Sequence, residues 1–283
     1  GNALISYTGL EPVTDNMSAT DRVFTFTGGA ETITLADAAG ANMTIDSTLG
    51  ESVTFANPSG SLTINAGTGD DTLTISSVDA AYNVDLTING DAGNDTVNFN
   101  SDVTFATGEN LNVDLTVDAA SGDLDSMNVG GNANLLTFGA GTILARVSRS
   151  VTLNAGSSFV TENGNLTVEA NQQATPTAGG FTGVLILGGV IQSGTGNVSV
   201  KGTGGTRAGS FDPNIGVYVG QNGAQPGQIK ATGTGTVTVQ GTGGANPSGT
   251  SNIGVHIDAG GLISGSAGTV NVTGQAGATA GSS

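Results

Sequence analysis

One short pattern recurs along most of this chain: an apolar residue, then Thr or Asn, then a second apolar residue. It is centred on Thr25, Thr34, Thr44, Thr54, Thr63, Thr74, Thr87, Asn98, Thr104, Thr116, Asn128, Thr137, Thr152 and Thr167. Alternation with period two places both apolar side chains on one face of an extended strand and the polar one on the other. The sequence therefore predicts many short strands with one buried face each.

The spacing of the first six centres, 9 to 11 residues, suits β-sandwiches and barrels as well as solenoids. The last hundred residues are more specific. Equivalent units begin at Gly183, Gly216 and Gly254, at intervals of 33 and 38 residues. Each unit then has an isolated apolar position (Ile191, Ile229 and Ile263) and a further strand (starting at Val198, Val237 and Val270). Three strands per unit of 30-odd residues predict an all-β fold, a parallel β-helix with little or no helix.

The composition supports this fold class and divides the chain in two. Gly is abundant at 48 residues, Cys and Trp are absent, and Lys plus Arg total only 6, which leaves few residues for long solvated helices. Residues 1–150 form an acidic β-solenoid or β-rich repeat region, and residues 151–283 a Gly/Thr-rich β-helix that we expect to be continuous with it. About nine coils at roughly 4.8 Å each predict a rod about 45 Å long.

The formal net charge of −17 argues against nucleic acid and anionic membranes as partners, because phosphate binding needs clustered cations. No apolar run approaches the roughly 18 to 20 residues of a membrane-spanning helix. Loops of variable length, Thr203 to Asn214 and Thr242 to Asn252, are expected at one corner of the coils. The closing residues 280–283 resemble the loop before Ile253, so we expect a further coil, in a larger parent chain or through end-to-end stacking of copies.

Two acidic turns, residues 66–74 and 90–98, resemble the Gly-Gly-x-Gly-x-Asp-x-apolar-x nonapeptide of RTX proteins, which binds Ca²⁺ between coils. The resemblance implies carboxylate ligands from Asp71 and Asp95 and carbonyl ligands from Gly67, Gly69 and Gly93. The adjacent Asp70 and Asp91 are further candidate ligands, and residues 28–33 resemble a degenerate third copy.

These turns depart from the RTX pattern in one respect. RTX nonapeptides occur in tandem, whereas Asp71 and Asp95 are 24 residues apart with a further strand between them. The alternative is that Gly-Asp and Asn-Asp form tight turns before a strand and bind no metal. Both interpretations stay open at this point.

Residues 9–13 and 51–57, together with the two acidic turns, look like repeat units of very large bacterial surface proteins. Residues 183–283 are similar to filamentous-haemagglutinin-type β-helix repeats. The resemblance implies a secreted or surface-attached fibre, adhesin or sheath component that associates with itself or with cell-surface glycans. A surface-layer lattice protein would have a similar acidic, Cys-free composition.

A polysaccharide-binding or polysaccharide-cleaving β-helix protein is the main alternative. The candidate acid pairs are Asp70 with Asp71 and Asp123 with Asp125, and the close cations are Arg146 and Arg149. Sugar clefts usually contain aromatic platforms, and this chain has no Trp and only three Tyr. The single His, His256, occupies the strand position that matches Leu185 and Tyr218. We therefore expect no catalytic residues and no enzyme activity.

Overall fold

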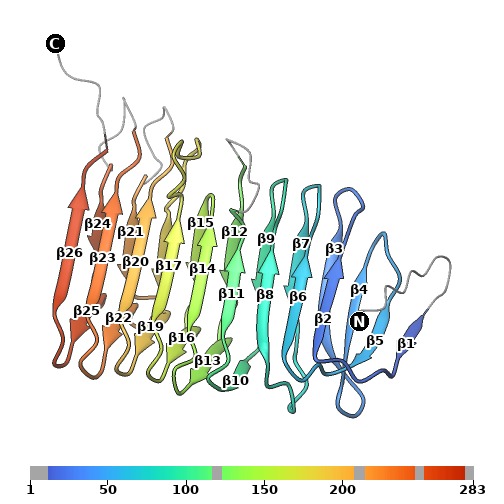
Figure 1. Cartoon of the computed structure of the whole chain (residues 1–283). Coiled ribbons are helices and arrows are strands. Elements are labelled where there is room, and N and C mark those ends of the chain that lie inside the picture. The colour runs from blue at the N-terminus through green and yellow to red at the C-terminus, as the bar shows by residue number, and fades with distance from the viewer. Residues whose placement is uncertain (1–11, 117–122, 207–213, 246–251, 278–283) are drawn as a thin grey trace.

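The computed structural model describes residues 12–116, 123–206, 214–245 and 252–277, and within these ranges the chain forms 26 strands and no helix. The strands wind into a β-solenoid whose three sheets run along its length (Figure 1). The prediction of an all-β parallel β-helix is confirmed.

Sheet 1 has 11 strands, sheet 2 has nine and sheet 3 has six. Sheet 1 contains, in spatial order, β1 (Val13–Asp15), β5 (Val53–Ala56), β4 (Asn42–Ser47), β3 (Thr32–Ala38), β7 (Thr72–Ile75), β9 (Thr96–Phe99), β12 (Ser126–Val129), β15 (Ser150–Leu153), β18 (Val184–Leu187), β21 (Val217–Gly220) and β24 (Val255–Ile257). Sheet 2 contains β2 (Asp21–Thr25), β6 (Ser61–Asn65), β8 (Asp85–Asn89), β11 (Leu111–Asp114), β14 (Ile143–Val147), β17 (Leu166–Ala170), β20 (Val198–Thr203), β23 (Val237–Thr242) and β26 (Val270–Gln275). Sheet 3 contains β10 (Val103–Thr107), β13 (Asn134–Phe138), β16 (Ser158–Thr161), β19 (Val190–Ser193), β22 (Gln228–Ala231) and β25 (Leu262–Gly265).

From β10 onwards each coil has three strands, whereas the coil that begins with β7 and β8 has only two. Between β7 and β8 the chain has no strand, but it still contributes the buried side chains of Tyr82 and Val84 to the core. The Tyr82 ring meets the edge of Phe105 on β10 at a centroid distance of 6.3 Å. Irregular chain thus occupies the place of sheet 3 before that sheet begins.

The N-terminal end departs from the parallel pattern. Strands β3, β4 and β5 form an antiparallel meander, in which Leu35 pairs with Ile45 and Thr44 with Thr54. The even spacing of the predicted strands at Thr34, Thr44 and Thr54 therefore comes from hairpins and not from coils. Arg22 packs over the Phe55 ring at this end and hydrogen-bonds the carbonyl of Ala56.

The predicted register of the last coils is confirmed. Leu185, Tyr218 and His256 are cross-strand partners, as are Ile191, Ile229 and Ile263, and as are Val198, Val237 and Val270. Coils differ in length because their connections differ: cross-strand partners in adjacent coils are separated by 23 to 40 residues. The predicted variable loops connect sheet 2 to sheet 1, and residues 207–213 and 246–251 within them lie outside the described residues.

One hydrophobic core runs from Ile33 to Val239 without a break at residue 150. The core consists of every second residue of each strand, as the alternating sequence pattern predicts. Strand β13 is an exception, since Leu135 and Thr137 face inward and Phe138 is exposed. The predicted inward pair Leu136 and Phe138 is therefore wrong, because Thr137 buries its hydroxyl by donating a hydrogen bond to the carbonyl of Gly141.

Candidate functional site

A column of acidic side chains lies just before four neighbouring strands of sheet 1. Glu31 precedes β3, Asp71 precedes β7, Asp95 precedes β9 and Asp125 precedes β12. Successive strands pair in register, Thr32 with Thr72 with Thr96 with Ser126, so the four acids are stacked along the solenoid. We refer to Glu31, Asp71, Asp95 and Asp125 as the acid column.

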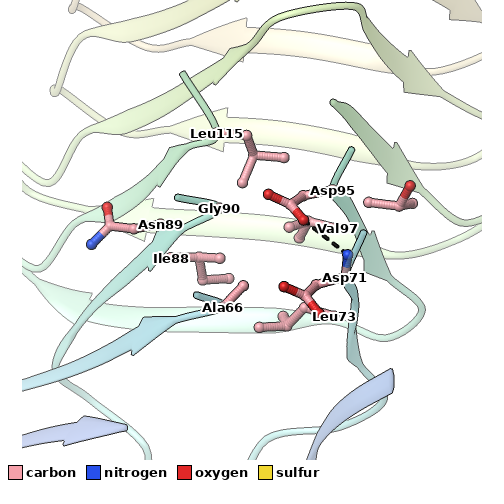
Figure 2. A pocket seen from close by; sticks show the side chains of 10 residues that line it. Ala66, Asp71, Leu73, Ile88, Asn89, Gly90, Asp95, Val97 and Leu115 are labelled. Carbon is pink, nitrogen blue, oxygen red and sulfur yellow. Dashed lines mark hydrogen bonds between the residues drawn. The ribbon is translucent and has the colours of Figure 1, made fainter. Parts of the chain in front are cut away.

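Backbone hydrogen bonds connect the acid column from coil to coil. The amide of Glu31 donates to Oδ1 of Asp71 at 2.7 Å. The amide of Asp71 donates to Oδ1 of Asp95 at 2.9 Å, and Figure 2 shows this second bond. The amide of Asp95 donates to Oδ1 of Asp125, whose own amide donates to the hydroxyl of Ser148. Each of these Asp side chains thus satisfies a backbone N–H that the turn leaves unpaired.

The second carboxylate oxygen of each Asp points into the solenoid. Asp71, Asp95 and Asp125 are only 1, 2 and 1% exposed, and their Oδ2 atoms have no hydrogen-bond partner. The space beside Asp71 and Asp95 is lined mainly by apolar side chains, namely those of Ala66, Leu73, Ile88, Val97 and Leu115 (Figure 2). Such surroundings favour the neutral form of a carboxyl group.

The pKa values follow from this burial. Burial is the largest cause and raises the pKa of Asp95 to about 7 and that of Asp125 to about 6, although the backbone hydrogen bonds act in the opposite direction. The pKa of Asp71 is also raised, by burial and by the charges of Glu31 and Asp70. Burial therefore favours the protonated form of these carboxyl groups more than in ordinary Asp side chains.

The predicted calcium ligands are only partly brought together. Asp71 and Asp95 stack, but their Oδ1 atoms accept backbone hydrogen bonds, and the carbonyl of Gly67 accepts one from the amide of Ala92. Gly69 and Gly93 have positive φ angles of 131° and 141° and lie where adjacent turns approach closely.

The neighbouring acids of the two turns are also used differently. Asp70 is exposed and accepts two hydrogen bonds from Asn94, while Asp91 adopts a left-handed turn conformation with φ of 63°. The described part of the chain contains no group of three or more acidic, His or Cys side chains placed to hold a metal ion. These oxygens do not fit an RTX-type calcium cage, which needs six or more oxygen ligands. Calcium binding stays a prediction that metal titration tests.

Sequence reasoning found part of the acid column. The degenerate copy at residues 28–33 does align with the two acidic turns, through Glu31. Asp125 has no Gly-rich turn before it, and the sequence indicates it only as a candidate catalytic acid together with Asp123. Adjacent Asp70 and Asp71 face opposite sides of the strand, outward and inward, so they do not form the converging pair that glycoside hydrolysis needs.

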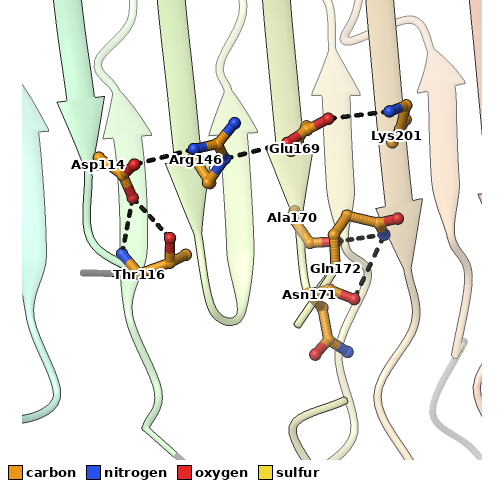
Figure 3. Close-up of polar contacts among 8 residues, drawn as sticks. All are labelled: Asp114, Thr116, Arg146, Glu169, Ala170, Asn171, Gln172 and Lys201. Carbon is orange, nitrogen blue, oxygen red and sulfur yellow. Dashed lines mark hydrogen bonds and ion pairs between the residues drawn. The ribbon is translucent and has the colours of Figure 1, made fainter. Parts of the chain in front are cut away.

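A second cluster of charged residues crosses the outer face of sheet 2. Asp114, Arg146, Glu169 and Lys201 are cross-strand partners on β11, β14, β17 and β20. Arg146 pairs with Asp114 and Glu169, and Lys201 with Glu169, each at 3.0 Å (Figure 3). Burial alone would raise the pKa of Glu169, but the hydrogen bonds from Lys201 and Arg146 lower it. Arg146 is thus engaged in ion pairs along the sheet.

Replacing Arg146 with Met should lower the free energy of unfolding by about 1 kcal/mol, because two half-exposed ion pairs are lost and each contributes roughly 0 to 1 kcal/mol. Lys201→Met, which removes one pair, is the matched control and should have about half this effect. Guanidinium chloride is a salt and would screen the ion pairs, so it is unsuitable as the denaturant. Urea titrations at low and high ionic strength are the measurement. Equal stability of Arg146→Met and wild type at low salt would contradict a stabilising role.

Comparison of the chain with protein-family models, curated proteins and solved structures finds no match. Across the described ranges, no helix has the length and hydrophobicity that crossing a membrane requires.

Proposed function

We propose that this chain is a structural or adhesive segment of an extracellular bacterial fibre, in which β-solenoid coils stack on one another into a longer rod. The acid column and the charged residues of sheet 2 act in this function as connections between coils.

The proposal rests mainly on the exposure of apolar side chains in the coil formed by β24, β25 and β26. Val272 on β26 is the cross-strand partner of Val239 on β23, yet Val272 is 45% exposed and Val239 is fully buried. Ile257 and Val270 are similarly exposed in place of the buried Val219 and Val237. The apolar side chains of a coil are therefore covered by the next coil, and the strand edges are paired by it.

Electron microscopy and sedimentation of the purified chain test this proposal. The longest sheet, with eleven strands, spans roughly 50 Å at about 4.8 Å between strands. We expect wild type to form end-joined rods longer than this as the protein concentration increases, and Val272→Asp to remain as single short rods. Thr273→Asp, on the same strand but facing outward, is the matched control and should behave as wild type.

Circular dichroism should show that Val272→Asp stays folded, because Val272 is already half-exposed. Short single rods of wild type at every concentration would contradict coil stacking. Binding and cleavage assays with glycans would then be the next experiments.

A further inference from the structure

The outer face of sheet 1 differs from the other two faces of the solenoid in its charge. The six consecutive strands β7, β9, β12, β15, β18 and β21 contain no Asp, Glu, Lys or Arg, although the chain has a net charge of −17. By contrast, Asp114, Arg146, Glu169 and Lys201 cross the outer face of sheet 2, and Lys230 lies on sheet 3. Sheet 1 therefore presents an uncharged strip on an acidic molecule, which suits an uncharged partner better than an ionic one.

The strip is regular, because its strands pair in register. Each coil contributes one outward side chain to its central column, which consists of Thr74, Asn98, Asn128, Thr152, Leu185, Tyr218 and His256. At about 4.8 Å between strands, this column is roughly 30 Å long. A ligand that repeats along its own length can contact several coils at once, and such multiple contacts raise the overall affinity. The strip therefore fits a polymer better than a small molecule.

The strip changes from small polar to apolar and aromatic side chains at β18. Leu185, Tyr218 and His256 are all partly exposed on this face. Of the other two Tyr residues, Tyr82 is buried and Tyr7 lies outside the described residues, so Tyr218 is the Tyr ring that the described surface presents. Apolar and aromatic side chains that gather on an exposed face indicate a contact surface.

Tyr218 is held in position by its neighbours. Its hydroxyl donates a hydrogen bond to Oδ2 of Asp258 at 2.8 Å, and its ring meets the ring of His256 edge-on at a centroid distance of 5.3 Å. A Cβ atom on Gly220 would lie only 2.6 Å from the Tyr218 ring, so the absence of a side chain at Gly220 leaves room for the ring. A ring that is already fixed loses little conformational freedom when a ligand binds.

These side chains match the two kinds of contact that a sugar offers. The apolar C–H face of a pyranose stacks on an aromatic ring, and the hydroxyl groups around its edge form hydrogen bonds with polar side chains. Tyr218 provides the ring, while the imidazole of His256 and the exposed carboxylate of Asp258 provide polar groups beside it. Asn128 and Thr152 continue the polar contacts along the strip.

We propose that the outer face of sheet 1 binds an uncharged polysaccharide along its length, with Tyr218 as the platform for one sugar ring. This inference rests on the adhesive role in the proposed function, to which it adds the class of ligand and the face that binds it. It does not depend on coil stacking, because sheet 1 runs along the side of the solenoid (Figure 1).

The test measures the retention of the purified chain on cellulose, chitin and β-1,3-glucan, with polygalacturonate as the anionic comparison. We expect at least one of the three neutral polymers to retain wild type, and polygalacturonate to retain much less. Tyr218→Ala should weaken the binding about ten-fold, because the stacking contact is lost. Tyr218→Phe keeps the ring and should have a smaller effect. Phe138→Ala removes a partly exposed ring from sheet 3, so it is the matched control and should bind as wild type does.

Val272→Asp separates this inference from coil stacking, because it leaves the strip unchanged. Binding of a neutral polymer by wild type and Val272→Asp alike, when neither forms longer rods, would contradict coil stacking alone. The inference is overturned if wild type forms longer rods but none of the three neutral polymers retains it, if polygalacturonate retains it equally well, or if Tyr218→Ala binds as wild type does. Self-association of Val272→Asp that the added Tyr218→Ala change abolishes, without polymer binding, would assign the strip to a second copy of the chain and would also overturn the inference.

Discussion

Replacing Gly196 with Ala should lower the free energy of unfolding by about 3 kcal/mol or more, because the added methyl group meets backbone that cannot move aside. A Cβ atom on Gly196 would lie closer than 3.0 Å to the carbonyl oxygen of Gly164 in the preceding coil. The same is true of each member of a column at the corner before sheet 2: Gly141, Gly164, Gly196, Gly235 and Gly268.

The carbonyl of Gly164 is held in place from inside the solenoid. The hydroxyl of Thr161 donates a hydrogen bond to it at 2.7 Å, and the hydroxyl of Ser193 donates another at 3.1 Å. Both hydroxyl groups are buried, so a shift of this carbonyl would leave them unpaired at a cost of about 1 to 3 kcal/mol. The corner therefore cannot accommodate a methyl group without losing these hydrogen bonds.

Urea denaturation monitored by circular dichroism is the measurement, and Gly29→Ala is the matched control. A Cβ atom on Gly29 would meet nothing within 4 Å, and the φ angle of Gly29 lies outside the left-handed region. Gly29→Ala should therefore remain within about 0.5 kcal/mol of wild type. If Gly196→Ala changes the free energy of unfolding as little as Gly29→Ala does, the glycine corner before sheet 2 can widen. Close approach of successive turns would then not limit stability.

The sequence predicts the last coils better than the first, for a physical reason. From Gly183 onwards, three separate features recur in the same order, and only stacked coils keep all three in register. The first strands offer only an even spacing, which hairpins and coils produce equally well. The antiparallel meander of β3, β4 and β5 was therefore not predictable from the spacing alone.

The alternation of the sequence is sufficient to predict that the acid column faces inward. Asp71, Leu73 and Ile75 alternate, as do Asp125, Met127 and Val129, so period two places each acid on the buried face. Turn chemistry indicates instead that Gly-Asp and Asn-Asp form tight turns before a strand. What no pattern could show is that each carboxylate accepts the amide of the preceding coil, because that depends on the stacking.

Phe99→Ala should lower the free energy of unfolding by about 3 to 5 kcal/mol, whereas Phe138→Ala should change it by less than about 1 kcal/mol. The sequence pattern treats both residues alike, as the second apolar residue after a small polar one. In the structure Phe99 is fully buried on β9 between Ile75 and Val129, and Phe138 is 38% exposed on β13.

The two variants, compared by urea denaturation, therefore test which face of β13 is inside. Burial of Thr137 in place of Phe138 is compensated by its hydrogen bond to Gly141, and the same arrangement recurs one coil later with Thr161 and Gly164. Loss of more than about 2 kcal/mol in Phe138→Ala would mean that β13 is shifted by one residue, which reverses its faces. Such a shift would also break the hydrogen bond from Thr137 to the carbonyl of Gly141. Thr137→Val would then leave the free energy of unfolding unchanged, whereas in the present register it should lower it.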